Sequence, residues 1–373
     1  MFNAIINYLL NLKYQQQVKR NKEVKINRST AVGIVTLQDQ QNYGNRLQNV
    51  ALTQIIKKLG YHPVSLLPKM EQPNFKGLRL LLRRKQKNLI AFSEEYLQYD
   101  YIDPAEWQHF AKVIVGSDQV WNTTWMSKKR FKHYLLNTVP PRRRVAYAAS
   151  MGRHDFASQQ LSAIFNQEIT KFQYTSARES QVADVIAQQI HKEVPIVLDP
   201  VLLLDLNDWE KTLTLDQSSQ KEQVFTYFLT PQTEKVRTFI ADTVTQNKLN
   251  LVAFNDARQA HNFVRDPRAF VQEIRNSKLV ITDSFHATAF AIIFKVPFIT
   301  VPRSDGEKMS SRLEQLFCSL GLEPRWLIDV PMDNVFKINF DPVTAKLEIA
   351  QRESLNFLKT ALQMEEKSTH ESY

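Results

Sequence analysis

Residues 31–37, which read AVGIVTL, are followed by a polar loop and then by a stretch with a four-residue apolar repeat. The residues of this segment are mostly β-branched or apolar, as expected for a buried strand. Apolar side chains then recur at every fourth position from Leu47 to Leu59 and predict a helix that ends at Gly60. The apolar run at residues 62–67 predicts a second strand. A strand, a helix and a strand in this order predict a parallel β-α-β unit with a right-handed crossover.

The same alternation of strands and helices continues along most of the chain. Further strands are predicted at residues 112–116, 144–150, 195–199, 224–229, 249–254, 279–282 and 297–301, and helices at 161–172, 179–189, 232–246, 267–276, 284–294 and 311–320. Such alternation is typical of α/β domains built on a parallel sheet. We therefore expect an α/β protein with two Rossmann-like domains that face a central cleft.

The predicted domain division follows from chain length and from one polar stretch. A chain of 373 residues is longer than a single hydrophobic core usually supports. Residues 206–222 are largely polar, which is typical of a domain boundary. The expected parts are a basic N-terminal segment at residues 1–28, an N-terminal Rossmann-like domain at 29–215, a C-terminal Rossmann-like domain at 222–335 and a closing helix at 340–364.

The composition is that of a soluble globular protein, with 43% hydrophobic and 23% charged residues. No apolar run approaches the roughly 18 residues that a membrane-spanning helix needs, and residues 1–12 lack the features of an export signal. Cys318 is the only cysteine, and it lies in an apolar run that predicts a small core residue. A single cysteine without a disulfide partner suits a reducing compartment. We expect a cytoplasmic protein, with the inner face of the cell membrane as an open alternative.

The net charge of +10 is concentrated in basic clusters at residues 19–28, 79–87, 128–132 and 142–144. Clusters of this kind attract anions. They match no nucleic-acid-binding motif, so we expect no nucleic-acid partner. Peripheral contact with an anionic membrane, or binding of a lipid-linked phosphosugar, remains open, as does a solvated basic face without any partner.

Four loops that follow predicted strands are rich in groups that can do chemistry. They are residues 42–48, 117–122, 283–288 and 302–304, the last leading to 310–313. Ligands of open α/β sheets bind at the carboxyl ends of the strands, so we expect these loops to converge at the cleft between the domains.

Each loop also has a structural alternative. Asn42 can form a turn, Asp118 can cap a helix, and Trp121 can anchor the core. His286 stands at the start of a predicted helix that Asp283 or Ser284 can cap, where backbone N–H groups are open to an anion. A histidine at a helix start can equally be a surface or capping residue.

Seven pieces of the chain, taken in order, resemble the motifs of the polysaccharide pyruvyl transferase family. They are NYG (42–44) with LQ (47–48) and AL (51–52), VGSDQVWN (115–122), AYAAS (146–150), SARE (176–179), LDP (198–200), TDSFH (282–286) and RL (312–313). Together they cover roughly residues 30–325, and their order makes the signal specific. One departure is Ala287, where the family usually has glycine, and a methyl group there could narrow the pocket. The family's fold resembles the two-domain glycosyltransferase arrangement called GT-B.

The resemblance implies transfer of pyruvate from phosphoenolpyruvate to a sugar of a cell-surface polysaccharide precursor. The product would be a cyclic ketal, phosphate would be released, and the partners would be phosphoenolpyruvate and a glycan or lipid-linked sugar acceptor. It implies His286 as general acid or base and Asp118 as a second proton carrier. The implied donor-binding residues are Arg178, Arg303, Arg312 and Ser284; the implied substrate-binding residues are Asn42, Gln48, Ser117, Gln119, Trp121 and Asn122. We expect no cofactor and no metal, because the histidines lack the paired spacings of zinc sites.

Two other functions remain open at this point. A glycosyltransferase that uses a nucleotide sugar could share the same two-domain fold, because fold does not fix function. A non-catalytic protein that binds acidic surfaces through its basic clusters is the third hypothesis.

Overall fold

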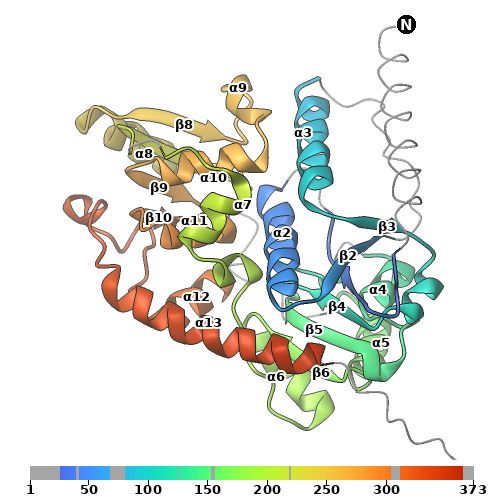
Figure 1. The fold of residues 1–373 in the computed structure, drawn as a ribbon. Coiled ribbons are helices and arrows are strands. Elements are labelled where there is room, and N and C mark those ends of the chain that lie inside the picture. Colours follow the sequence, from blue (N-terminus) through green and yellow to red (C-terminus); the bar gives the residue numbers. More distant parts are fainter. Residues whose placement is uncertain are drawn as a thin grey trace, which may run out of the picture.

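The computed structural model describes residues 26–38, 42–67, 80–124, 126–152, 156–217, 220–303 and 311–363. Most of the predicted basic segment at 1–28 lies outside these ranges. The described residues form two separate parallel sheets with helices packed around them, seen at the right and the left of Figure 1. The predicted α/β class with two parallel-sheet units is confirmed.

The first sheet has six parallel strands in the order β3-β2-β1-β4-β5-β6. The strands are β1 (Ala31–Val35), β2 (His62–Leu67), β3 (Tyr99–Tyr101), β4 (Lys112–Gly116), β5 (Arg144–Ala149) and β6 (Tyr174–Ala177). In β1, every residue is buried, and Ile34 pairs with Ser65 on one side and with Ile114 on the other. A strand buried on both faces reads as a continuous apolar run, which is why this segment was recognisable in the sequence.

Helices cover both faces of the first sheet. They are α2 (Tyr43–Lys58), α3 (Leu80–Tyr96), α4 (Lys128–Tyr134), α5 (Gln159–Ile169) and α6 (Ser180–Ile190), with short 3₁₀ helices η1 (Pro104–His109), η2 (Pro141–Arg143) and η3 (Pro200–Leu203). The next helix, α7 (Leu206–Leu213), lies beside α10 and α11 of the second half. The Asn42 side chain accepts a hydrogen bond from the Gly44 N–H at 3.0 Å and so caps α2. Helix α2 is buried around most of its circumference, because it packs on β2 and also on α10 and α11 of the second sheet.

The second sheet has four parallel strands in the order β10-β9-β7-β8. The strands are β7 (Gln223–Tyr227), β8 (Asn250–Phe254), β9 (Leu279–Thr282) and β10 (Phe298–Thr300). The helices of this half are α8 (Glu234–Gln246), α9 (Ala260–Phe263), α10 (Pro267–Arg275), α11 (Phe285–Ile293) and α12 (Ser311–Leu320), with the 3₁₀ helix η5 (Met332–Asn334). Strands β9 and β7 pair along their length, for example at Thr282 and Tyr227. The carboxyl end of β9 therefore leads into α11 beside the end of β7.

The last helix, α13 (Asp341–Leu362), joins the two halves of the molecule. It leaves the second half beside α12 and runs below the first sheet (red in Figure 1). Its Ser354 Oγ accepts a hydrogen bond from the Leu198 N–H at 3.0 Å, and its Gln351 side chain donates to the Leu202 carbonyl at 2.7 Å. Within the described ranges, no helix combines the length and apolarity that crossing a bilayer requires.

The two halves also share a buried contact at the start of α2. The Tyr43 ring stacks on Phe270 with centroids 5.1 Å apart, and its hydroxyl donates to the Arg265 carbonyl at 2.9 Å. The ammonium group of buried Lys85 lies 4.6 Å from the Tyr43 ring centroid and donates to Asn255 at 2.8 Å. These contacts fix the first turn of α2 against the second half.

The prediction of a strand at residues 195–199 is wrong. Only Ile196 forms a bridge, to Ala177 at the edge of β6. Pro195 and Pro200 have no N–H to donate to a sheet, and the Leu198 N–H is used by Ser354. The segment instead places its last residue, Asp199, in the interior.

The prediction that Cys318 is a core residue is also wrong, because its side chain is exposed. Helix α12 buries one face, made up of Leu313, Leu316, Phe317 and Leu320. These positions follow helical spacing, and Cys318 falls on the opposite face.

Residues 206–222 are not entirely without structure, since they include α7. Only Trp209 and Leu213 of this helix are buried, which explains why the stretch looked polar in the sequence. The Trp209 ring meets the edge of Phe290 at a centroid distance of 4.9 Å, so this helix packs on α11.

Candidate functional site

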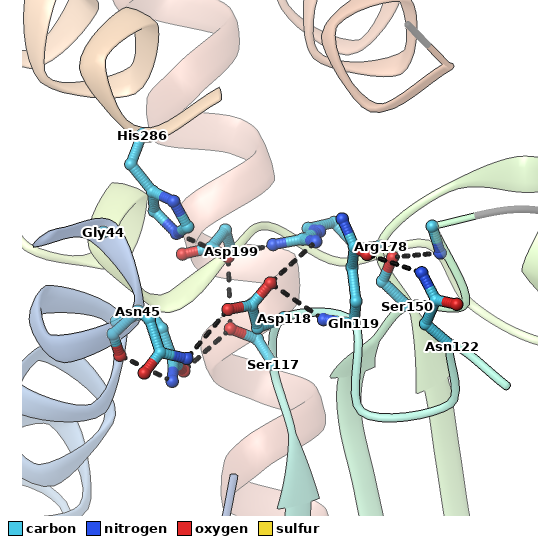
Figure 2. A network of polar contacts seen from close by, with 12 residues as sticks. Gly44, Asn45, Ser117, Asp118, Gln119, Asn122, Ser150, Arg178, Asp199 and His286 are labelled. Atoms are coloured by element: carbon cyan, nitrogen blue, oxygen red, sulfur yellow. Dashed lines mark hydrogen bonds and ion pairs between the residues drawn. The ribbon is translucent and has the colours of Figure 1, made fainter. Parts of the chain in front are cut away.

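A network of buried polar side chains lies where the first turns of α2 and α11 approach each other (Figure 2). His286 is in the first turn of α11, whose N-cap Ser284 accepts a hydrogen bond from the Ala287 N–H at 3.4 Å. The side chain is only 5% exposed. Its Nε2 lies 3.7 Å from Oδ2 of Asp199 and has no hydrogen-bond partner. This nitrogen is therefore available to exchange a proton with a ligand.

The Asp199 carboxylate contacts Arg178, Ser117 and His286, as Figure 2 shows. Its Oδ2 accepts a hydrogen bond from Nη1 of Arg178 at 2.6 Å and lies 3.1 Å from Oγ of Ser117. Its Oδ1 accepts from the Val201 N–H at 3.1 Å. Burial would raise the pKa of Asp199, but His286 and Arg178 hold that pKa well below its usual range. The group is thus a carboxylate at neutral pH, although it is completely buried.

Asp118 supplies a second buried carboxylate to the network. Its φ of 62° is left-handed, and its Oδ2 accepts from the Asn45 side chain at 2.9 Å. Burial raises the pKa of Asp118, but the Arg178, His286 and Arg312 charges outweigh this and lower it. No helix begins between Asp118 and residue 124, so the helix-capping alternative does not apply.

Ser117 and Gln48 connect this network to the end of β1. Ser117 Oγ lies 3.0 Å from Oε1 of Gln48, and the Gln48 amide donates to Oγ1 of Thr36 at 2.9 Å. All three side chains are buried, so their hydroxyl and amide groups have few alternative partners. Of the three, Ser117 contacts Asp199 directly and so helps to orient its carboxylate.

Arg178 also belongs to the network, and two of its three guanidinium nitrogens donate no hydrogen bond. Its guanidinium carbon is 4.9 Å from the Phe285 ring centroid, and the side chain is 2% exposed. Nε and Nη2 donate no hydrogen bond, although they lie 3.7 Å from Glu179 and 3.9 Å from Asp118. Buried donors without acceptors are costly, so an anionic ligand would be stabilised here.

Arg312 is a second buried guanidinium, from the first turn of α12. With its amide oxygen turned to this group, Gln119 accepts from Nη1 at 3.2 Å and Nη2 at 2.8 Å, while Nε has no partner. Burial and the positive charges of Arg178 and Arg303 lower the pKa of Arg312 to about 9. At Arg312 these two positive charges act more strongly than the Asp118 and Glu179 carboxylates, so an anion bound beside it would be stabilised.

Gln119 and Asn122 extend the network to the loop after β5. Their amide groups lie 2.8 Å apart, and Asn122 Oδ1 accepts from the Thr124 N–H at 3.1 Å. A Cβ added to Gly152, whose φ is 67°, would lie 2.5 Å from the Gln119 amide. Glycine at this position is therefore what permits the close approach of the two loops.

Trp121 lies apart from the polar network. Its side chain is fully buried, and its indole N–H donates to the Tyr134 carbonyl at 3.0 Å. Its ring packs edge-on against Phe165 at 5.3 Å. Trp121 thus takes the alternative role that the sequence left open, an anchor in the core of the first sheet.

Asp283 and Ser284 shape the loop before α11. The Asp283 carboxylate accepts from the N–H groups of Leu229 at 2.7 Å and Thr230 at 2.9 Å, while burial raises its pKa. The Ser284 N–H donates to Oγ1 of Thr282 at 3.0 Å. These bonds hold the end of β9 against the loop after β7 and so fix the position of the helix that carries His286.

A pocket of about 310 Å³ reaches the network from the side of α12 and α13. Its walls include Arg178, Asp199, Phe285 and Arg312. Residues 196–198, Leu202 and residues of α12 and α13 complete the lining, and His286 lies behind Asp199 rather than in the wall. The pocket therefore places a space for a small acid against both guanidinium groups and the carboxylate that faces His286.

Some members of this network were not predicted from the sequence. Asp199, Asn45 and Glu179 received no role, although Asp199 directly follows an apolar run and lies in a motif piece. Glu179 accepts from Ser150 Oγ at 2.6 Å, and its other carboxylate oxygen has no partner. An acidic residue at the end of an apolar run was the available signal for Asp199.

Comparison with known proteins gives both a family and structural likenesses. Among solved structures, the chain is similar to the UDP-GlcNAc 2-epimerase of Neisseria meningitidis bound to UDP-GlcNAc, with a TM-score of 0.48 and 12% identity over 88% of this chain and 100% of that one. It is also similar to the ADP-heptose heptosyltransferase II of E. coli, with a TM-score of 0.36 and 10% identity over 87% of this chain and 99% of that one. No curated protein matches. The family model for polysaccharide pyruvyl transferase matches residues 42–305, more than half of the chain, and the chain therefore belongs to that family.

Proposed function

We propose that this protein transfers pyruvate from phosphoenolpyruvate to a sugar of a cell-surface polysaccharide precursor, forming a cyclic ketal and releasing phosphate. One observation supports this above all: Arg178 and Arg312, both buried, border one pocket and keep N–H groups without a hydrogen-bond acceptor. Phosphoenolpyruvate carries a phosphate and a carboxylate, and planar guanidinium groups bind both kinds of anion in a bidentate manner.

The helix start at Ser284 and the side chain of Arg303 would complete the donor site. Helix α11 directs its first N–H groups toward the network, and anions are favoured at such helix ends. The Arg303 charge acts on both Arg312 and Asp283. We assign the phosphate to the arginines, because they offer the strongest donors.

His286 is our candidate for the proton carrier. Its Nε2 has no hydrogen-bond partner and lies 3.7 Å from Oδ2 of Asp199. In the proposed reaction the imidazolium protonates C3 of phosphoenolpyruvate, which makes C2 oxocarbenium-like. Asp199 itself positions the imidazole and Arg178 and is not required to take up the proton.

The remaining steps balance without a cofactor. A first sugar hydroxyl attacks C2 and gives its proton to a base, for which Asp118 and neutral His286 are the candidates. The bond between C2 and the phosphate oxygen breaks, and phosphate leaves with the electron pair. A second hydroxyl attacks C2, and its proton departs with the phosphate. Asn42, Gln48, Ser117, Gln119 and Asn122 are proposed to orient the substrates, directly or through the two carboxylates. Independence from metal ions stays a prediction.

The identity of the donor substrate distinguishes this function from transfer of a sugar from a nucleotide sugar. The purified protein is incubated with a polysaccharide precursor and either phosphoenolpyruvate or nucleotide sugars, and consumption of each donor is followed together with release of phosphate. The proposal expects consumption of phosphoenolpyruvate that depends on the precursor. Consumption of a nucleotide sugar alone would contradict it.

A further inference from the structure

Glu179 is a buried acid that stands beside the proposed anion site and has no part in the reaction steps described above. Its side chain is 2% exposed, and one carboxylate oxygen accepts a hydrogen bond from Ser150 Oγ at 2.6 Å. The other oxygen, Oε2, has no hydrogen-bond partner. A buried carboxylate oxygen without a donor is costly for the folded state, so a role beyond folding is expected for this group.

Helix capping does not explain this carboxylate. Glu179 occupies the N-cap position of α6, where a polar side chain usually accepts a hydrogen bond from a backbone N–H of the first turn, but its side chain makes no such bond. The carboxylate lies beside Arg178 instead, with Oε2 3.7 Å from Nε of that guanidinium group. This separation is too long for a hydrogen bond, but the two opposite charges attract each other strongly in the interior.

Arg312 is the second guanidinium group on which the Glu179 charge acts. The N–H of Ser180, the next residue, donates to the Gln315 side chain at 3.2 Å. Gln315 follows Arg312 by three residues in α12, so this bond holds the start of α6 against the helix that carries Arg312. Burial lowers the pKa of Arg312, and the Glu179 carboxylate acts in the opposite direction. The two arginines of the proposed anion site thus share one buried acid.

An anion bound by both guanidinium groups would meet this fixed negative charge. Like charges repel each other strongly inside a protein, so the Glu179 carboxylate weakens the binding of an anion to Arg178 and Arg312. The proposed transfer leaves inorganic phosphate at these two arginines, where charge-assisted hydrogen bonds would otherwise hold it tightly. Release of a tightly held product limits the turnover of many enzymes. A carboxylate at this place therefore favours departure of the phosphate.

We propose that Glu179 is a positioning residue that acts through Arg178 and Arg312, limits their affinity for phosphate and so lets this product leave. The inference rests on the proposed function, in which phosphate is the leaving group, and adds a residue that governs its release. Ser150 keeps the carboxylate in place, because its hydroxyl accepts from the Gly152 N–H at 3.1 Å and donates to Glu179. Without a ligand the same carboxylate stabilises the two buried guanidinium groups.

Phosphate binding by the Glu179→Gln variant tests this role without turnover. The substitution keeps the size of the side chain and an oxygen that can accept from Ser150, but it removes the charge. Isothermal titration calorimetry with inorganic phosphate should give a Kd about tenfold to a hundredfold lower than that of the wild type, because a nearby like charge is removed. A side chain needed only for folding would leave phosphate binding unchanged or weaken it, so the sign of the change distinguishes the two roles.

Glu273→Gln is the matched control. Glu273 is also a buried acid, paired with Arg265 at 2.8 Å, but its carboxylate lies outside the polar network, so this variant should melt below the wild type and bind phosphate equally well. Glu179→Asp keeps the charge and should bind phosphate more weakly than Glu179→Gln does. Equal or weaker phosphate binding by folded Glu179→Gln, or no binding by either protein, would overturn the inference. Because no sugar and no phosphoenolpyruvate are present, this result does not depend on whether pyruvate is transferred, which the donor experiment tests.

Discussion

Gly44, the second residue of α2, packs directly against the imidazole of His286 (Figure 2). A Cβ added at Gly44 would collide with Nδ1 and Cγ of that ring. Gly44 has an ordinary helical backbone, so it is the approach of the two helices that requires glycine here. This contact sets how far His286 lies from Asp199.

Gly44→Ala should therefore displace the imidazole and lower kcat for phosphate release by about tenfold to a hundredfold, because small misplacement of a catalytic group is costly. The matched control is Gly60→Ala, where an added Cβ meets no atom within 4 Å, although its φ of +88° costs some stability. Unchanged kcat in a folded Gly44→Ala protein would show that the imidazole position is not critical.

His286→Gln should lower kcat by about a hundredfold or more, in line with the usual contribution of a general acid or base. The KM for phosphoenolpyruvate should change little, because the guanidinium groups remain. Steady-state phosphate release measures both constants, and exposed His261→Gln is the control. A non-catalytic binding protein would instead keep its biological role in the His286→Gln variant.

Arg312→Met tests the excess of positive charge. The pKa of Arg312 is lowered to about 9, so at pH 7 the folded state holds this charge less favourably than the unfolded chain does. Without ligand, the variant should melt no lower than the wild type. The rise in Tm that phosphoenolpyruvate causes should largely disappear, because ligand stabilisation follows occupancy.

Arg325→Met is the matched control for that experiment. Arg325 is also a buried arginine, but it donates to the backbone carbonyls of Phe298, Asn334 and Val335, none of which belongs to the polar network. Its loss should lower Tm and leave the phosphoenolpyruvate shift intact. If Arg312→Met also kept the full shift, Arg312 would not bind the donor.

Asp199→Asn should destabilise the protein at pH 7 by about 3 kcal/mol, because it leaves buried Arg178 without its main anion. The pKa of Asp199 is depressed in the folded state. The ionised carboxylate therefore stabilises the folded protein fully above about pH 5, and this stabilisation is lost as the pH falls. Acid unfolding of the variant should thus depend less steeply on pH. Chemical denaturation between pH 3 and 7 measures the free energy of unfolding of each protein, with the more exposed Asp256→Asn as control. If this free energy depended on pH in the same way for the wild type and for Asp199→Asn, the role assigned to Asp199 would be contradicted.

The basic N-terminal segment yields a separate prediction about membranes. Deleting residues 1–25 removes most of its charge but keeps Arg28, which pairs with Asp100 at 3.1 Å. If the segment holds the enzyme near lipid-linked acceptors, the shortened protein should sediment less with anionic vesicles at low salt. Equal sedimentation of both proteins would remove the membrane contact and the location at the inner membrane face.

The sequence revealed the strands better than it revealed the site. Buried parallel strands such as β1 are continuous apolar runs, so most strands of both sheets could be predicted. Strands β3 and β6 were missed, because they are short and only partly buried. The role of Asp199 could not, because it depends on Arg178 and His286 being brought to it from other elements. Trp121 shows the converse: its motif suggested a site residue, whereas packing beside Phe165 places it in the core. Local pattern does not determine which side of a loop faces a ligand.

The central claim is that the protein adds pyruvate as a ketal to a polysaccharide. The most direct measurement is a proton NMR spectrum of the surface glycan from cells that contain the wild-type protein, the His286→Gln variant or no protein. The account predicts a ketal methyl resonance with the wild type and none in the other two samples. A resonance that persists without the protein, or a wild-type glycan that lacks it, would contradict the account.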